Sequence, residues 1–157
     1  MTATTGVAAV QLGGCTLHHA FNIPIDTCNT NVTRQRWDIN ALRAIDVLVI
    51  DEVSLCSAEL IDALDMEARL ARMNVTPFGG IQVIACGDFL QLSNNAVLSA
   101  LPAYEGEAFK HLIHVKLVTP MRHSEGDPLL DLLTDLRCGR FNAKTFASLD
   151  RPVCEDA

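Results

Sequence analysis

Acidic side chains follow two apolar segments of this sequence at the point where each segment ends. Asp51 and Glu52 close the run Val47–Ile50, and Asp88 follows Ile81–Cys86 after a single glycine. Runs that are apolar on both faces are typical of buried parallel strands, so both segments are predicted as strands. Ligands of such sheets bind at the carboxyl ends of the strands, so these acids mark the edge at which chemistry is expected.

The pair Asp51-Glu52 resembles a Walker B element. In such an element the first acid, Asp51, holds Mg²⁺, usually through water. The second, Glu52, orients or deprotonates the water that attacks the γ-phosphate. Acidic pairs at strand ends also cap the helix that follows, and this alternative stays open for an isolated pair.

The segments around these acids alternate between strand and helix patterns. Ile45–Asp51 and Ile81–Cys86 are predicted as buried strands, and His111–Val118 is a third strand candidate. The polar segment Asn22–Thr33 is predicted as a loop, and Pro77–Gly80 as a turn before the second strand. The spacing leaves room for helices between the strands.

Three helices are predicted. A short one covers about Thr33–Ala44, and a longer one starts after the N-cap Ser57 and ends near Met73. Asp127-Pro128 opens the last. Its wide apolar face carries five leucines: Leu129, Leu130, Leu132, Leu133 and Leu136. This alternation predicts a three-layer α/β domain with a mainly parallel sheet.

The composition is typical of one globular domain. Of 157 residues, 49% are hydrophobic, so a sizeable core is expected. No apolar run reaches the ~18 residues of a membrane span, and Met1–Gly6 has no signal-peptide core, which predicts a soluble, intracellular chain without a membrane partner. The net charge of -7 disfavours a generally basic face, so any DNA contact must use a local groove.

Six cysteines occur at positions 15, 28, 56, 86, 138 and 154. They form no C-x-x-C pair and no zinc-like spacing. Cys56 and Cys86 lie beside or inside apolar runs. The cysteines are therefore predicted to be reduced and to act as small hydrophobic residues.

Two sequence patterns, one at the acidic pair and one after the second strand, resemble those of a known family. Asp51–Ser54 follows the D-E-x-S pattern of superfamily-one helicases, and Phe78–Leu92 resembles their third motif, which ends G-D-x-x-Q-L. In these enzymes the glutamine, here Gln91, senses the γ-phosphate and couples it to domain movement. A glutamine amide can bond a phosphate oxygen or the attacking water. The structural alternative for Gln91 is a hydrogen bond from a loop to a helix.

The N-terminal residues resemble the Pif-type (petite integration frequency) helicases. Thr4–Ala9 and Gly13–Phe21 match roughly T-G-x-A-A and G-G-x-T-x-H-x-x-F. In that family the stretch grips the backbone of single-stranded DNA. The resemblance carries this role to four positions: Thr5, Gly6, Thr16 and His18. For His18, a structural hydrogen bond is the alternative.

Leu117–His123, followed by a helix that ends R-x-G, resembles the fourth motif of the family. The resemblance implies that Arg122 reaches the γ-phosphate of ATP. A guanidinium there stabilises transition-state charge, an effect of up to ~10³–10⁵ in rate for arginine fingers. An ordinary surface cation is the alternative for Arg122.

Taken together, the motifs imply a RecA-like P-loop NTPase fold, incomplete at its N-terminus. Residues 1–140 would be part of the first motor domain, and 141–157 an unassigned tail. The implied activity is ATP-dependent 5′-to-3′ DNA unwinding, with ATP as substrate, Mg²⁺ as cofactor and single-stranded DNA as partner. DNA repair, recombination and telomere maintenance, in the nucleus or mitochondrion, follow by resemblance alone.

The family pattern is incomplete in these residues. None of Lys110, Lys116 and Lys144 lies in a G-x-x-x-x-G-K-[S/T] loop, which would cradle the phosphates, and the second motor domain is also missing. Ser93-Asn94 stand where the family usually has two prolines, and His123 where glutamine is common. The isolated chain is therefore expected to be inactive.

Two other interpretations stay open. One is a non-catalytic helicase remnant that folds and acts as a binding or interaction module. The other is a RecD-like ATPase, and the G-G-x-T-x-H stretch over Gly13–His18 argues against it and for the Pif type.

Overall fold

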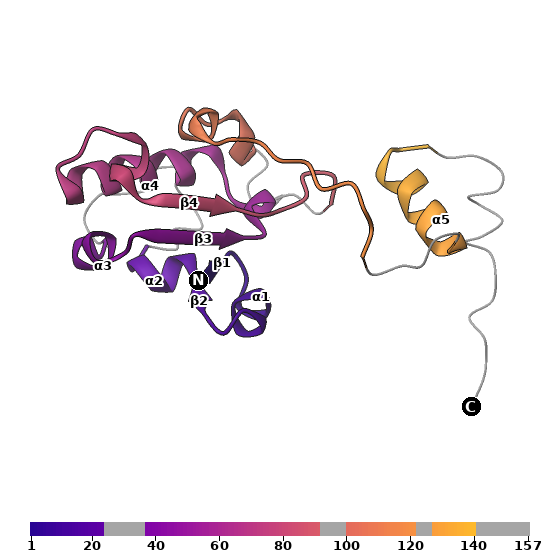
Figure 1. Cartoon of the computed structure of the whole chain (residues 1–157), viewed down its shortest axis with the longest axis horizontal. Helices are drawn as coiled ribbons and strands as arrows, with labels where there is room; N and C mark the ends of the chain where they lie inside the picture. Colours follow the sequence, from indigo (N-terminus) through magenta and orange to yellow (C-terminus); the bar gives the residue numbers. More distant parts are fainter. Residues whose placement is uncertain (24–36, 92–99, 122–126, 141–157) are drawn as a thin grey trace. The chain divides into compact units, whose positions relative to one another are not determined.

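The computed structural model describes residues 1–23, 37–91, 100–121 and 127–140. The chain divides into two compact units, Met1–Ile113 and His114–Ala157, and each is described by itself. All strands among the described residues belong to the first unit (Figure 1). The predicted division into residues 1–140 and a tail over 141–157 stays a prediction, because that tail lies outside the described residues.

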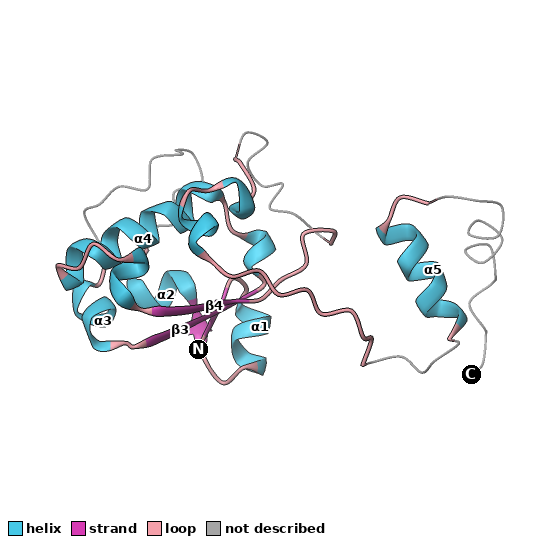
Figure 2. Cartoon of the chain, turned by 45° about the horizontal axis from the view of Figure 1, so that its top comes forward, coloured by secondary structure: helices cyan, strands magenta, loops and turns pink. Residues whose placement is uncertain are grey.

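A parallel sheet of four strands, in the order β2-β1-β3-β4, forms the centre of the first unit. β3 (Val47–Asp51) pairs with β4 (Gln82–Ala85), and the arrows of these two strands point the same way in Figure 1. β1 (Thr2–Ala3) lies between β3 and β2 (Cys15–Thr16). Figure 2 draws the strands in magenta among the helices.

Two predicted strands are confirmed as β3 and β4, each two residues shorter than predicted. The expectation that both are buried on both faces is wrong. Leu48 and Ile50 of β3 are buried, but Val47 is 49% exposed on the opposite face, and Ile84 of β4 is 43% exposed. The described residues therefore cover one face of this strand pair more completely than the other.

The third strand candidate, His111–Val118, is wrong. His111 ends a short 3-10 helix, and the residues from Ile113 to Val118 form no strand. Ile113 is 93% exposed and Leu117 is 90% exposed. A strand exists only where a neighbouring strand bonds its backbone, and no described residue pairs with this segment, whatever its side chains favour.

Helix α4 (Ala58–Arg72) confirms the prediction at both ends. The Ser57 hydroxyl accepts a hydrogen bond from the backbone N–H of Leu60 at 3.2 Å, which is the expected N-cap. Met73 ends the helix in the left-handed region, with φ of 49°. One face of α4 is buried in the core, through Ile61, Leu64, Ala68 and Ala71.

Helix α3 (Ile39–Ala44) is shorter than predicted. The Asp38 side chain caps it by accepting hydrogen bonds from two backbone N–H groups, so Trp37 and Asp38 precede the helix. Residues 33–36 lie outside the described part of the chain, as does most of the loop predicted over Asn22–Thr33.

Helices lie on both faces of the sheet. α1 (Gly6–Gln11) connects β1 to β2, whereas α2 (Leu17–Phe21), α3 and α4 lie in the connections that lead to β3 and β4. Parallel crossovers are right-handed, and the step from β1 to β2 runs opposite to the later steps, which puts α1 on the face opposite α2, α3 and α4. This is the predicted three-layer α/β arrangement.

The core lies between the sheet and the helices α2, α3 and α4. Its most completely buried large side chains are Leu17, Leu42, Ile50, Ile61 and Leu64. Short 3-10 helices complete the first unit: η2 (Val53–Leu55), η3 (Pro77–Gly80), η4 (Ala103–Glu105) and η5 (Ala108–His111). η3 occupies the predicted turn.

The second unit contains helix α5 (Pro128–Arg137), as predicted. Asp127 caps it by accepting a hydrogen bond from the backbone N–H of Leu129 at 2.9 Å, and Pro128 occupies the first turn. None of its side chains is buried, and Leu129 is 50% exposed.

Candidate functional site

The carboxyl ends of the strands meet at one edge of the sheet. Ala3 is in register with both Thr16 and Asp51, and Ile50 is in register with Ala85. The residues that follow β1, β3 and β4 therefore leave the sheet side by side. This is the edge at which the acids at strand ends predicted chemistry.

Asp51 and Glu52 form a tight turn at this edge. An Asp51 carboxylate oxygen accepts a hydrogen bond from the backbone N–H of Glu52 at 3.0 Å. Glu52 has φ of 55° and ψ of 41°, a left-handed conformation that is uncommon for a residue with a side chain. Both acids are partly exposed, whereas Val53 and Ser54 behind them are buried.

The acids do not cap helix α4, because Ser57 performs that role. Glu52 precedes η2 without a side-chain capping hydrogen bond. The alternative that this acidic pair serves mainly as a helix cap therefore loses its main support.

Two neighbouring segments hold the turn in place. The Thr4 hydroxyl donates to the Glu52 carbonyl oxygen at 3.1 Å, and the Thr4 N–H donates to the Asp51 carbonyl oxygen at 3.2 Å. From the other side, the Val53 N–H donates to the Cys86 carbonyl oxygen at 2.9 Å. The turn is thus tied to the segments that follow β1 and β4.

Asp88 shapes the segment after β4, a role that the sequence interpretation did not assign to it. Its carboxylate accepts hydrogen bonds from the Leu90 N–H at 3.1 Å and from the Gln91 side-chain amide at 2.9 Å. Its carbonyl oxygen accepts from the Gln91 N–H at 3.1 Å. An aspartate that bonds the N–H two residues later is a common turn signal, and it could have been read from the sequence.

Gln91 is exposed in this structure, and its side chain is held by Asp88. The structural alternative for Gln91 was a bond from a loop to a helix, and its observed partner instead lies in the same turn. The amide would exchange this partner for a phosphate oxygen or a water if a nucleotide bound at the edge.

The four residues expected to contact DNA follow β1 and β2. Thr5 and Thr16 are the N-caps of α1 and α2, and each hydroxyl accepts a backbone N–H at 3.2 Å. A Cβ on Gly6 would meet no atom within 4 Å, so its surroundings are open. Partial burial lowers the pKa of His18 below its ordinary value, which favours the neutral imidazole.

Arg122 lies outside the described residues, as does His123. The structure therefore brings Asp51, Glu52 and the segment carrying Gln91 to one edge, and the predicted convergence with Arg122 stays a prediction.

Asp51 is the residue that would hold Mg²⁺ at this edge. Within the described ranges, no three His, Cys, Asp or Glu side chains gather closely enough to hold a metal ion. Mg²⁺ at nucleotide sites is commonly bound by one or two carboxylates together with phosphates and waters, so a single partly exposed aspartate fits such a site.

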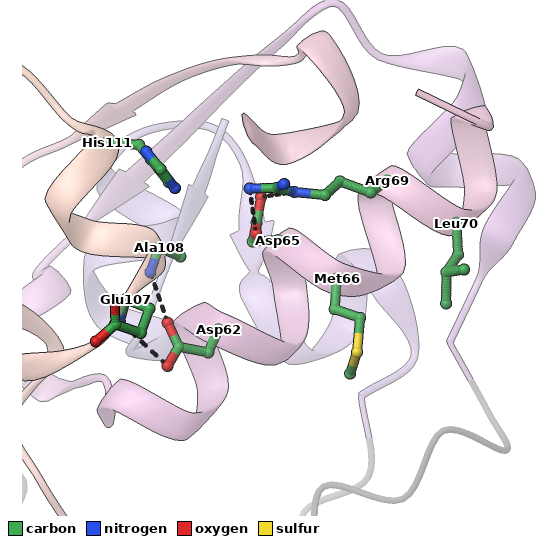
Figure 3. A pocket seen from close by; sticks show the side chains of 8 residues that line it. All are labelled: Asp62, Asp65, Met66, Arg69, Leu70, Glu107, Ala108 and His111. Atoms are coloured by element: carbon green, nitrogen blue, oxygen red, sulfur yellow. Dashed lines mark hydrogen bonds and ion pairs between the residues drawn. The ribbon is translucent and has the colours of Figure 1, made fainter. Parts of the chain in front are cut away.

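A pocket of about 440 Å³ lies elsewhere, between α4 and η5 (Figure 3). Asp62 accepts hydrogen bonds from the Ala108 and Glu107 N–H groups, and Asp65 pairs with Arg69 at 2.8 Å. These polar groups fasten η5 to α4 and stabilise the helix. The pocket contains none of the predicted site residues.

Among the helices that the structure describes, none combines the length and the apolar character needed to cross a membrane.

Known proteins match the chain over nearly all of its length. The family model of the PIF1-like helicases matches residues 1–129. The ATP-dependent DNA helicase PIF3 of Trypanosoma brucei brucei is 59% identical over 157 residues, which are 100% of this chain and 19% of that protein. The ATP-dependent DNA helicase PIF1 of Saccharomyces cerevisiae is 36% identical over 169 residues, 99% of this chain and 20% of that protein.

Solved structures agree with these matches. The Pif1 helicase from Candida albicans superimposes with a TM-score of 0.82 at 34% identity, over 98% of this chain and 37% of that one. The Bacteroides Pif1 helicase in complex with ADP-AlF3 and ssDNA has a TM-score of 0.81 at 26% identity, over 99% of this chain and 41% of that one. This chain spans about a fifth of the two curated relatives. It belongs to the PIF1-like helicase family.

Proposed function

We propose that this chain is part of the first motor domain of an ATP-dependent 5′-to-3′ DNA helicase. The observation that supports this most strongly is the turn Asp51-Glu52, which is fastened at one edge of a parallel sheet to the segments after β1 and β4. The proposed division of labour is nucleotide chemistry at β3 and β4, and DNA contact after β1 and β2.

At the nucleotide, each residue has a distinct proposed role. Asp51 would hold Mg²⁺ through water, and the ion would neutralise charge on the phosphates of ATP. Glu52 would orient or deprotonate the attacking water. Gln91 would sense the γ-phosphate, and Arg122 would stabilise the charge that develops on it.

At the DNA, the proposed contacts are with the backbone of a single strand. The hydroxyls of Thr5 and Thr16 and the open approach at Gly6 suit phosphate and sugar contacts. His18, held neutral by its surroundings at neutral pH, would act as a hydrogen-bonding group and not as a cation. Because the relatives are DNA helicases, we propose that the protein acts in the nucleus or mitochondrion, in DNA repair, recombination or telomere maintenance.

These 157 residues contain no glycine-rich loop ending in lysine and serine or threonine. Such a loop supplies most of the phosphate contacts of a P-loop NTPase. We therefore expect no ATP hydrolysis by the isolated residues, and the activity is proposed for a protein that supplies this loop and a second motor domain.

A chimera supplies both missing parts for the test. In it, these 157 residues replace the matching segment of the Trypanosoma brucei brucei PIF3 helicase; it is called the PIF3 chimera below. We expect ATP hydrolysis that single-stranded DNA stimulates. Glu52→Gln should lower the DNA-stimulated kcat by about 100-fold or more, because the water loses its base.

The matched control is Asp46→Asn, at the opposite end of β3 and with a side chain that is 96% exposed. It removes one carboxylate near the same strand and should change kcat by less than about twofold. A chimera that hydrolyses no ATP, or equal losses in Glu52→Gln and Asp46→Asn, would overturn the proposed function.

The absence of a phosphate loop from these residues favours a second candidate, a remnant that folds and binds without catalysis. Calorimetric titration of the isolated chain with Mg²⁺ and ATP tests it. The remnant interpretation predicts no measurable ATP binding, and micromolar affinity would contradict it. The RecD-like interpretation has lost its basis, because the matching family and relatives are PIF1-like helicases.

A further inference from the structure

Thr4 joins the proposed DNA-binding segment directly to the proposed catalytic turn. It follows β1, and its neighbour Thr5 caps helix α1. Its hydroxyl donates to the Glu52 carbonyl oxygen at 3.1 Å, and its N–H donates to the Asp51 carbonyl oxygen at 3.2 Å. One residue is therefore adjacent to a DNA contact and bonded to the backbone of both acids.

Glu52 depends on such contacts, because its backbone is in the left-handed region, with φ of 55°. A residue with a side chain holds this conformation only where its surroundings impose it. The Glu52 N–H is bonded to Asp51, and its carbonyl oxygen accepts from the Leu55 N–H at 3.0 Å. Those partners lie in the turn or in η2, which follows it, so Thr4 ties the carbonyl oxygen of Glu52 to the segment after β1.

We propose that Thr4 is a positioning residue whose hydroxyl sets the orientation of Glu52 and transmits single-stranded DNA binding at Thr5 and Gly6 to the attacking water. The proposal rests on the proposed function. The transmission is short, because a shift of Thr5 or Gly6 moves the adjoining Thr4 backbone. A shift of Thr4 in turn lengthens or tightens its bond to Glu52.

The geometry also offers a matched control in the same strand. The Thr2 hydroxyl donates to the Val49 carbonyl oxygen at 2.7 Å, and Thr2 is 4% exposed. This bond also joins β1 to β3, but it meets the strand before the turn begins. Loss of the Thr2 hydroxyl should therefore reduce stability without affecting the orientation of Glu52.

The PIF3 chimera provides the test, with Thr4→Val, Thr4→Ser and Thr2→Val compared with the unsubstituted chimera. Valine keeps the shape of threonine without the hydroxyl, and serine keeps the hydroxyl. ATP hydrolysis is measured with and without a single-stranded oligonucleotide, together with the KM for ATP and the Kd for the oligonucleotide. Thermal unfolding reports folding of each variant.

We expect Thr4→Val to lower the DNA-stimulated kcat about tenfold, as misplacement of a catalytic group does, while the KM for ATP and the Kd for DNA change less than about threefold. Thr4→Ser should stay within about twofold of the unsubstituted chimera, and so should Thr2→Val even if its unfolding temperature falls. If Thr4→Val does not fold, Thr4→Ala replaces it with the same expected results.

Three results would overturn the proposal: full DNA stimulation in Thr4→Val, equal losses in Thr4→Val and Thr2→Val, or no recovery of kcat in Thr4→Ser. Each leaves the proposed function standing if the unsubstituted chimera hydrolyses ATP in response to DNA. An unsubstituted chimera without ATPase activity would overturn the proposed function, and the proposal about Thr4 with it.

Discussion

Gly87, in the segment after β4, packs against the residues that follow the turn Asp51-Glu52. A Cβ at this position would lie 3.0 Å from the backbone N of Val53 and from that of Ser54. Both are backbone atoms of η2, which follows the two acids. A backbone atom cannot move aside as easily as the end of a flexible side chain. The fit between these two segments therefore depends on the absence of a side chain at Gly87.

Gly87→Ala should consequently lower the stability of the isolated chain by about 1–3 kcal/mol, as overpacking does. Gly6→Ala is the comparison, because a Cβ there meets no atom within 4 Å and a helix start favours alanine over glycine. Urea unfolding followed by circular dichroism measures both. Equal stabilities of the two variants would contradict the close contact at Gly87.

Cys56 is buried in the core, as expected for a reduced cysteine that acts as a small hydrophobic residue. It is 1% exposed, and burial raises the pKa of its thiol to about 12. Since the thiolate is the reactive form, Cys56 should resist iodoacetamide at neutral pH, whereas the exposed Cys86 and Cys138 should react. Peptide mapping after labelling distinguishes them. Modification of Cys56 in the folded chain at the rate of Cys86 would contradict its burial.

At the scale of elements, the two faces of helix α4 differ in how far their side chains are buried. Leu64 is fully buried, whereas Leu70 is 56% exposed. Leu64→Ala should therefore cost about 2–5 kcal/mol through the cavity it leaves. Leu70→Ala on the same helix should cost no more than about 0.5 kcal/mol. Urea unfolding measures both, and similar losses would mean that α4 does not bury the face assigned here.

Local sequence patterns predicted the elements whose signals are complete within one segment. The N-cap Ser57, the apolar face of α4 and the apolar runs of β3 and β4 are of this kind. β1 and β2 have two residues each, too few for any periodic pattern. His111–Val118 has the side chains of a strand but no described neighbour to pair with, a condition that local sequence does not contain.

The residues of the candidate site also fall into two groups, those found from the sequence and those found only in the structure. The family motifs pointed to Asp51, Glu52 and Gln91, because these residues have recognisable types and spacing. Neither Thr4 nor Asp88 was assigned a role. Thr4 matters through a hydrogen bond that only the fold creates, whereas the bond from the Leu90 N–H to Asp88 is a local turn signal that the sequence does contain. Thr4 reaches a carbonyl oxygen 48 positions away in the sequence, and no local pattern reports such a pairing.

At the scale of the whole molecule, His18 should make stability depend on pH. Partial burial lowers its pKa in the folded chain below the ordinary value of 6.5, so the unfolded chain binds a proton more readily. The contribution of His18 is present above pH 6.5, and is lost as the pH falls through the lowered folded value.

Urea unfolding across this pH range tests the effect. His18→Asn should flatten the loss of stability on acidification, because it removes the group that protonates on unfolding. An unchanged slope in His18→Asn would show that the imidazole titrates alike in the folded and unfolded chains.

The proposed function places a triphosphate at the strand-end edge, between Asp51, Glu52 and Gln91. A crystal structure of the PIF3 chimera with Mg²⁺, ADP and aluminium fluoride tests it most directly. We expect Asp51 beside a water of the Mg²⁺ ion, Glu52 and Arg122 facing the aluminium fluoride, and Gln91 turned from Asp88 toward it. A fluoride bound on another face of the sheet, with Gln91 still paired to Asp88, would contradict it.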